Sequence, residues 1–134
     1  MEIYKDEYLV CRFNSDLSLL EQKWLETTED MSIDSFKKLS FKLLELYKKC
    51  DANKLLTDGT DFKFSISPEL QEWTVKNIIS GFIEKGITKY ANVVPKDLFA
   101  NVSAEQMIEE GIDAYPFTVK YFDSLDTAYK WLAE

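Results

Sequence analysis

The chain has 134 residues and a net charge of −8, with 24 acidic and 16 basic side chains and no histidine. This length suits a single domain over residues 1–134, and a chain of this size buries a substantial core. So acidic a surface repels nucleic-acid phosphates and anionic lipid headgroups, and we expect no nucleic-acid partner. The lack of histidine removes the commonest general base and metal ligand, so we expect a protein that is not an enzyme.

Three further features bear on the expected cellular setting. The first residues are charged, which is atypical of a signal peptide, and no apolar run approaches the length of about 20 residues that spans a membrane. The two cysteines, Cys11 and Cys50, lie far apart and do not show metal-ligand spacing. We therefore expect a cytoplasmic protein with two buried thiols, no membrane span, no metal and no cofactor.

Two strands are predicted near the start of the chain. Residues 7–13 are rich in β-branched and aromatic side chains, and residues 14–16 are typical of a turn. Residues 17–26 then form a second predicted strand. Together these segments predict an N-terminal antiparallel hairpin.

An amphipathic helix is predicted over residues 32–50. Ser32 is a suitable N-cap, and Asp34 carries the negative charge that the first turn of a helix favours. Apolar side chains then recur at steps of three and four residues, which predicts one buried face. That face carries Phe36, Leu39, Leu43, Leu46 and Cys50.

The middle of the chain predicts a buried strand followed by a long helix. Residues 54–58 are short and apolar, as in a central strand. After a polar loop, Ser67 precedes a proline and a glutamate, which is typical of a helix start with serine as the N-cap. Ser80-Gly81 predicts a kink or a split in this helix, and Gly86 is a suitable C-cap.

The C-terminal third continues the alternation of strands and helices. A strand is predicted at 89–95, a helix that begins with a capping box at 103–112, a strand at 117–122 and a last helix from about 125. The complete predicted order is β-β-α-β-α-β-α-β-α. This order predicts an α/β fold with flanking helices and a mixed sheet that starts with the antiparallel hairpin.

Several short motifs occur in an order typical of one superfamily. They are Leu55-Leu56-Thr57-Asp58 at a strand end, Ser67-Pro68-Glu69 with Trp73, Gly86 before Ala91 to Pro95, Ser103 with Gln106, and Phe122-Asp123-Ser124-Leu125 with Ala128, Trp131 and Leu132. On these motifs the chain resembles the SpoIIAA-like superfamily, which includes the STAS domains, and small bacterial proteins described as STAS/SEC14-like. The resemblance spans nearly the whole chain and implies the SpoIIAA-like (STAS-like) fold.

Ser67 has two interpretations. In the anti-sigma factor antagonists of that superfamily, a partner kinase phosphorylates a serine at the start of the helix after the third strand. Ser67 is its positional counterpart, so the resemblance implies a phosphorylation site there. Ile66, Pro68 and Glu69 depart from the Asp-Ser-Ser-Gly motif of those proteins. The other interpretation is a helix N-cap, which needs no partner.

The candidate site lies at the carboxyl ends of the parallel strands, where open α/β sheets bind ligands. Asp58 and Asp61 form either a carboxylate pair or a set of side chains that fix the loop. Phe62, Phe64 and Ile66 either line an apolar groove or cover the core. The residues expected to contact a partner or ligand are Asp58, Thr60, Asp61, Phe62, Phe64, Ser67, Trp73, Pro95 and Phe99.

Three functions from different classes follow from these features. The leading one is a non-catalytic binding or regulatory module that contacts a protein partner through the loop 59–66 and the helix start at Ser67. The alternative is a carrier of a small apolar ligand in an SEC14-like pocket. The third is an enzyme that uses Asp58 and Asp61 together with Lys96. A homodimer through apolar strand edges or aromatic helix faces is compatible with each of them.

Overall fold

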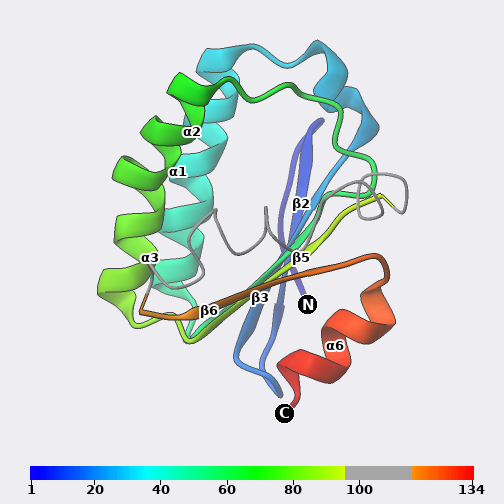
Figure 1. Cartoon of the computed structure of the whole chain (residues 1–134), viewed down its shortest axis with the longest axis vertical. Coiled ribbons are helices and arrows are strands. Elements are labelled where there is room, and N and C mark those ends of the chain that lie inside the picture. Colours follow the sequence, from blue (N-terminus) through cyan, green and yellow to red (C-terminus); the bar gives the residue numbers. More distant parts are fainter. Residues whose placement is uncertain (96–115) are drawn as a thin grey trace.

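The computed structural model describes residues 1–95 and 116–134, and its centre is a six-stranded mixed sheet (Figure 1). The strands lie in the sheet in the same order as in the chain. The pairings of the first three strands are antiparallel, and the remaining three pairings are parallel. The strands are β1 (Glu2–Lys5), β2 (Leu9–Asn14), β3 (Leu19–Trp24), β4 (Lys54–Asp58), β5 (Lys89–Val93) and β6 (Thr118–Phe122).

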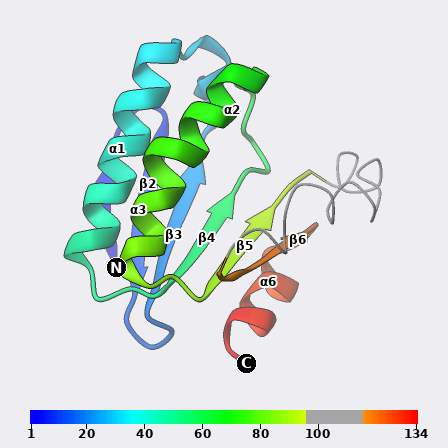
Figure 2. The same cartoon turned by 60° about the vertical axis from the view of Figure 1, so that its left-hand side comes forward.

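Helices cover both faces of this sheet (Figures 1 and 2). On one face α1 lies beside a long helical segment, and α6 lies on the other. Because β3, β4 and β5 are added to the sheet in one direction, right-handed crossovers place the helices between them on the same face. The helices are η1 (Glu26–Asp30, a 3-10 helix), α1 (Ile33–Lys49), α2 (Pro68–Thr74), η2 (Val75–Ile79, a π-helix), α3 (Ser80–Lys85) and α6 (Leu125–Leu132).

The predicted α/β fold with a mixed sheet is confirmed, with differences at the strand ends. The hairpin predicted at 7–13 and 17–26 is formed by β2 and β3, and the strand predicted at 89–95 ends at Val93. The edge strand β1 was not predicted, because it is only four residues long and two of these residues are charged. The helix predicted at 103–112 lies outside the described residues.

The prediction of an amphipathic helix at 32–50 is confirmed by α1. The Ser32 hydroxyl accepts a hydrogen bond from the Ser35 backbone N–H over 3.1 Å, as an N-cap does. The predicted apolar face is buried against the sheet, apart from Cys50, which is half-buried at the C-cap. Of the two thiols predicted to be buried, Cys11 on β2 is buried completely.

The long helical segment widens into the π turn η2 next to the kink predicted at Ser80-Gly81. The Ser80 N–H donates to the Val75 carbonyl, five residues earlier in the chain. The side chains of Thr74, Asn77 and Ser80 each donate to the carbonyl four residues before them, and so compete with the regular helical amides. The segment ends at Gly86, whose φ of 91° is the left-handed conformation of a C-cap glycine, as predicted.

Each face of the sheet carries its own apolar core. The larger core fills the space between the sheet and α1, α2 and α3, with Leu20, Leu55 and Tyr47 fully buried. The smaller core packs Ala128 and Leu132 of α6 against the opposite face. Across the described ranges, no helix is both long enough and apolar enough to cross a membrane.

Candidate functional site

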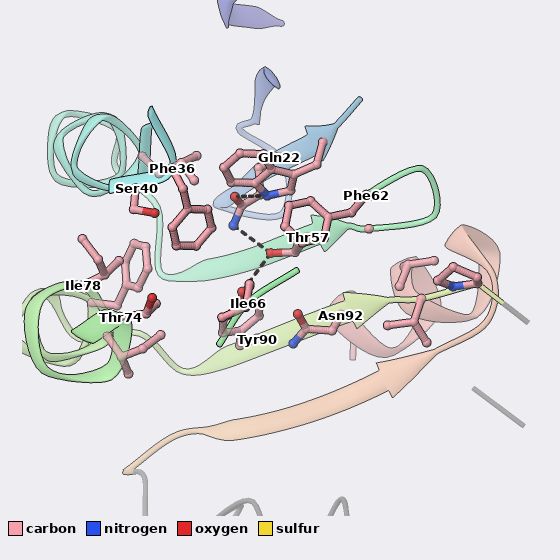
Figure 3. A pocket seen from close by; sticks show the side chains of 18 residues that line it. Gln22, Phe36, Ser40, Thr57, Phe62, Ile66, Thr74, Ile78, Tyr90 and Asn92 are labelled. Carbon is pink, nitrogen blue, oxygen red and sulfur yellow. Dashed lines mark hydrogen bonds between the residues drawn. The ribbon is translucent and has the colours of Figure 1, made fainter. Parts of the chain in front are cut away.

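A cavity of about 320 Å³ lies between the sheet and the helices α1, η2 and α3 (Figure 3). This volume falls at the lower end of the range for small-molecule sites, roughly 300–1,000 Å³. The cavity extends to the carboxyl ends of β4 and β5, where Gly59 and Pro95 line it. Its wall is largely apolar and includes Trp24, Phe36, Phe62, Ile66, Ile78 and Phe82.

A row of polar side chains forms the floor of the cavity. Gln22 on β3 is paired with Thr57 on β4, and Thr57 is paired with Asn92 on β5, so the three lie side by side across the sheet. Tyr90 precedes Asn92 by two residues and therefore faces the same side. All four side chains line the cavity. A sheet face covered by helices is normally apolar, so each of these polar groups requires a hydrogen-bond partner.

Three hydrogen bonds connect most of this row, and the direction of two of them can be assigned. The indole N–H of Trp24 donates to Gln22 Oε1 over 3.1 Å, and since an indole only donates, this contact fixes the orientation of the carboxamide. Gln22 Nε2 then donates to Thr57 Oγ1 over 2.7 Å. The hydroxyls of Thr57 and Tyr90 lie 2.9 Å apart and share a further hydrogen bond. Figure 3 shows this chain of contacts along the floor.

Asn92 extends the same row, but its carboxamide is unused. Within residues 1–95 and 116–134, no group makes a hydrogen bond with this side chain. The side chain lines the cavity from β5, next to Tyr90 (Figure 3). A carboxamide offers two N–H donors and one carbonyl acceptor. Asn92 therefore presents both kinds of hydrogen-bonding group to whatever fills the cavity.

The cavity is electrically neutral as far as the structure describes its lining. None of the described residues that line it is an aspartate, glutamate, lysine or arginine. Burial raises the pKa of the Tyr90 hydroxyl to about 12, with the Thr57 contact opposing the shift and nearby Tyr121 adding to it. Tyr90 therefore stays protonated and uncharged at neutral pH. A site of this kind favours uncharged ligands, because a buried charge needs a counter-charge.

Four aromatic rings, Trp24, Phe36, Phe62 and Phe64, form a cluster at one end of the cavity. The ring of Phe62 meets Trp24 edge-on at 5.5 Å, and Phe64 stacks on Phe36 at 5.2 Å. Trp24 and Phe36 stack at 5.9 Å. The cluster fixes the loop 59–66 against the core, and Thr28 adds a polar contact by accepting from the Lys63 N–H over 2.9 Å.

The two predicted interpretations of Phe62, Phe64 and Ile66 both apply in part. Phe62 and Ile66 line the cavity, as the groove interpretation requires. Phe64 packs on the core through Phe36 and does not line the cavity. Ile66 also keeps 43% of its surface exposed, so it lies at the outer margin of the site.

The predicted acidic residues lie elsewhere. Asp58 follows Thr57 on β4, so its side chain is on the opposite face of the sheet, under α6. It accepts from both the backbone N–H and the hydroxyl of Thr60, at 3.2 and 2.7 Å, which confirms a loop-fixing role for Asp58. Asp61 does not line the cavity either. In the described part of the chain, no group of three acidic, cysteine or histidine side chains could hold a metal ion.

The remaining predicted residues are spread around the site. The Ser67 hydroxyl accepts from the Leu70 N–H over 3.2 Å and thus caps α2, as predicted. Trp73 lies outside the cavity, where it meets Phe41 edge-on at 5.4 Å. Pro95 lines the cavity. Phe99 and Lys96 lie outside the described residues.

Sequence reasoning missed the polar floor. Gln22, Thr57 and Asn92 lie far apart in the sequence, with helices between them. Only the pairing of neighbouring strands brings them together, so no local pattern connects them. Each strand carries a weak signal of this floor. A polar residue stands two positions after a buried apolar or aromatic residue, and therefore on the same face of the strand. Three such positions in neighbouring strands would have pointed to a polar patch beneath the helices.

Protein-family models, curated proteins and solved structures were each compared with this chain, and none of them matches it.

Proposed function

We propose that this chain binds a small, uncharged and largely apolar molecule in the cavity between the sheet and the helices α1, η2 and α3. The observation that carries the proposal is an aromatic and aliphatic wall around about 320 Å³, with no charged side chain among its described lining residues. Transfer of an apolar molecule from water into such a space is favourable by roughly 25 cal/mol for each Å² buried. The proposal corresponds to the carrier of a small apolar ligand anticipated from the sequence.

The residues that surround the cavity are held rigidly in place. Trp24 and Phe36 are nearly buried and stack on each other, and Phe62 closes one end. The Gln22 carboxamide is tied at both ends, so the floor has a fixed shape. A preformed site loses little conformational entropy when a ligand binds, which favours measurable affinity for small molecules.

A cavity-filling variant tests the proposal. Ser40 is almost fully buried on α1 and lines the cavity, so Ser40→Leu places three further carbon atoms in that space. The probe is the uncharged fluorescent dye N-phenylnaphthylamine, titrated into the purified protein. We expect saturable binding to the parent chain and a loss of at least about tenfold in affinity in Ser40→Leu, an effect of roughly 1.4 kcal/mol.

The matched control is Ser80→Leu, the same change on the exposed side of α3, which should leave the affinity unchanged. Circular dichroism shows whether each variant is folded. If the parent chain does not bind the dye, or if a folded Ser40→Leu binds it as the parent does, the proposal fails. Ile66→Trp is a second variant, which narrows the cavity at its margin. Because Ile66 is half-exposed, the fold should tolerate the larger side chain.

A second candidate is the protein-binding or regulatory module that acts through the loop 59–66 and the helix start at Ser67. Its support is the exposed Ile66, which lies beside Ser67 on a loop fixed by the aromatic cluster. Phe62 and Phe64 pack inward, so Ile66 and Ser67 present the side chains that a partner would contact. Crosslinking from a photoreactive residue at position 66 in the native cell, compared with one at exposed position 53, would test this candidate.

The relationship to the SpoIIAA-like superfamily belongs to the same set of proposals. The short motifs described above support it, together with the alternation of strands and helices after β3. Phosphorylation of Ser67 would follow from that relationship. Mass spectrometry of the protein purified from its own cells would test it directly, because a phosphate adds a defined mass at one peptide. A bare peptide around Ser67 would leave the N-cap as the only role of this side chain.

A further inference from the structure

One side chain of the polar floor differs from its neighbours in its hydrogen bonding. Gln22, Thr57 and Tyr90 are joined by hydrogen bonds, and each has a protein partner. Asn92 lies in the same row, paired in register with Thr57, yet its carboxamide has no partner in the described ranges. Buried carboxamides normally pair with protein groups or with ordered water, and Asn92 is half-buried. The free carboxamide thus marks the point where the cavity can form a hydrogen bond with a ligand.

The chemistry around Asn92 limits what that contact is. The carboxamide both donates and accepts, and the neighbouring Tyr90 hydroxyl does the same. A ligand group that also donates and accepts, such as a hydroxyl or a carboxamide, can pair with the carbonyl and with one N–H of Asn92. A carboxylate or an amine would arrive charged in a space whose described lining holds no counter-charge, and burial would then be costly.

We propose that the Asn92 carboxamide binds the single polar group of the ligand, and that the ligand class is an aromatic or aliphatic molecule carrying one uncharged hydroxyl or carboxamide. This inference rests on the proposed function, because it requires the cavity to hold a ligand. The rest of the ligand contacts the aromatic wall. The site discriminates against the pure hydrocarbon, which leaves Asn92 unpaired, and against the carboxylate, which lacks a cation.

A matched series of four compounds tests this selectivity. The series is naphthalene carrying a hydrogen, a hydroxyl, a carboxamide or a carboxylate at the same carbon atom, and binding is measured at neutral pH by displacement of N-phenylnaphthylamine. We expect the hydroxyl and carboxamide compounds to bind about tenfold more tightly than naphthalene, the size of one buried hydrogen bond. The carboxylate should bind more weakly than naphthalene itself.

The variant Asn92→Leu assigns the effect to this side chain. In Asn92→Leu the hydroxyl and carboxamide compounds should lose their advantage, while naphthalene binds at least as well as before. The control is Asn53→Leu, the same change at an exposed position, which should preserve the order of affinities. As a readout in the parent chain alone, the NMR signal of the Asn92 side-chain amide should shift with naphthol and stay in place with naphthalene.

The outcomes separate the two proposals. If naphthalene binds and the hydroxyl adds nothing, or if the carboxylate binds most tightly, the role assigned to Asn92 is wrong and the ligand-binding cavity stands. If neither the dye nor any of the four compounds binds, both proposals fail. An advantage of the neutral polar compounds that disappears in Asn92→Leu alone supports the inference.

Discussion

Gln22 and Thr57 lie opposite each other on the parallel strands β3 and β4, and Gln22 Nε2 donates to Thr57 Oγ1 over 2.7 Å. The two residues are 35 positions apart in the chain. Gln22 is only 4% exposed, and its other carboxamide atom accepts from Trp24. The Gln22 side chain thus connects the cavity floor to the aromatic cluster, so its removal should destabilise both.

The first prediction concerns this contact. Gln22→Met removes both hydrogen bonds and leaves the buried Trp24 N–H without its acceptor. We expect the free energy of unfolding to fall by roughly 1–3 kcal/mol, the cost of a buried unsatisfied donor. Urea denaturation followed by Trp fluorescence measures the change. The neighbouring surface change Lys23→Met is the control, and an equal loss in both variants would contradict the prediction.

The second prediction concerns Tyr47, whose hydroxyl is buried without a hydrogen-bond partner in the described part of the chain. Because a buried unpaired hydroxyl is unfavourable, Tyr47→Phe should stabilise the protein by about 1 kcal/mol at neutral pH. The ring itself stays in place against Phe82, which it meets edge-on at 4.8 Å. Tyr90→Phe is the comparison, since it removes a bonded hydroxyl and should destabilise by about 1 kcal/mol. Thermal unfolding of the two variants should therefore shift in opposite directions.

Alkaline pH provides the third prediction. Burial raises the pKa of Tyr47 from its ordinary value of 10.0 to about 12, and the pKa of Tyr90 rises to about 12 chiefly for the same reason. Between about pH 10 and pH 12 the unfolded chain loses phenolic protons that the folded chain retains, so stability falls as the pH rises through this window. Below about pH 10 the contribution is fully present. Urea midpoints measured across the window should decline less steeply in Tyr47→Phe and Tyr90→Phe. A decline as steep as in the parent chain would rule this explanation out.

Ser67 offers a fourth prediction, which separates its two interpretations. Ser67→Ala removes the cap on the Leu70 N–H and should cost about 1 kcal/mol of stability. Ser67→Asp keeps a capping oxygen and adds a negative charge at the helix N-terminus, so its stability should match that of the parent chain. If Ser67 acts only as a cap, cells carrying Ser67→Asp should behave like the parent. A phenotype in Ser67→Asp without a loss of stability would instead reveal a charge-sensitive function.

The elements that could be predicted from the sequence are those whose causes are local. Ser32 and Ser67 cap helices through contacts to residues three positions away, and Gly86 ends a helix through its own backbone conformation. The apolar face of α1 follows from the period of the helix, so Phe36 and Leu43 could be assigned to the core.

The site was harder to predict because it depends on strand register and on the face of each strand. The cavity reaches the carboxyl edge where the sequence predicted the site, and Phe62 and Pro95 line the cavity there. Asp58 was grouped with them, yet a shift of one residue along β4 places it on the opposite face from Thr57. The row of side chains from Gln22 to Asn92 crosses three strands, and no local pattern encodes which residues will be neighbours.

The fifth prediction concerns the contact between α1 and α3, which support the cavity. A methyl group added at Gly81 would lie 2.6 Å from Cδ2 and 2.7 Å from Cδ1 of Leu44, a side chain that is itself buried. In an unhindered helix, replacing glycine by alanine stabilises by about 1 kcal/mol. Here we expect Gly81→Ala to destabilise by about 1–3 kcal/mol, because the added carbon forces α3 away from α1.

A double-mutant cycle with Leu44→Ala tests the cause of this effect. Leu44→Ala alone should cost about 2–5 kcal/mol, since it leaves a space in the core. In that background the methyl group of Gly81→Ala meets no Leu44 side chain, so the substitution should become stabilising. The sign of its effect on the urea midpoint should therefore reverse between the two backgrounds. A stabilising Gly81→Ala in the parent chain would show that α1 and α3 separate easily, and that the cavity between them and the sheet is more compliant than the close packing at Gly81 indicates.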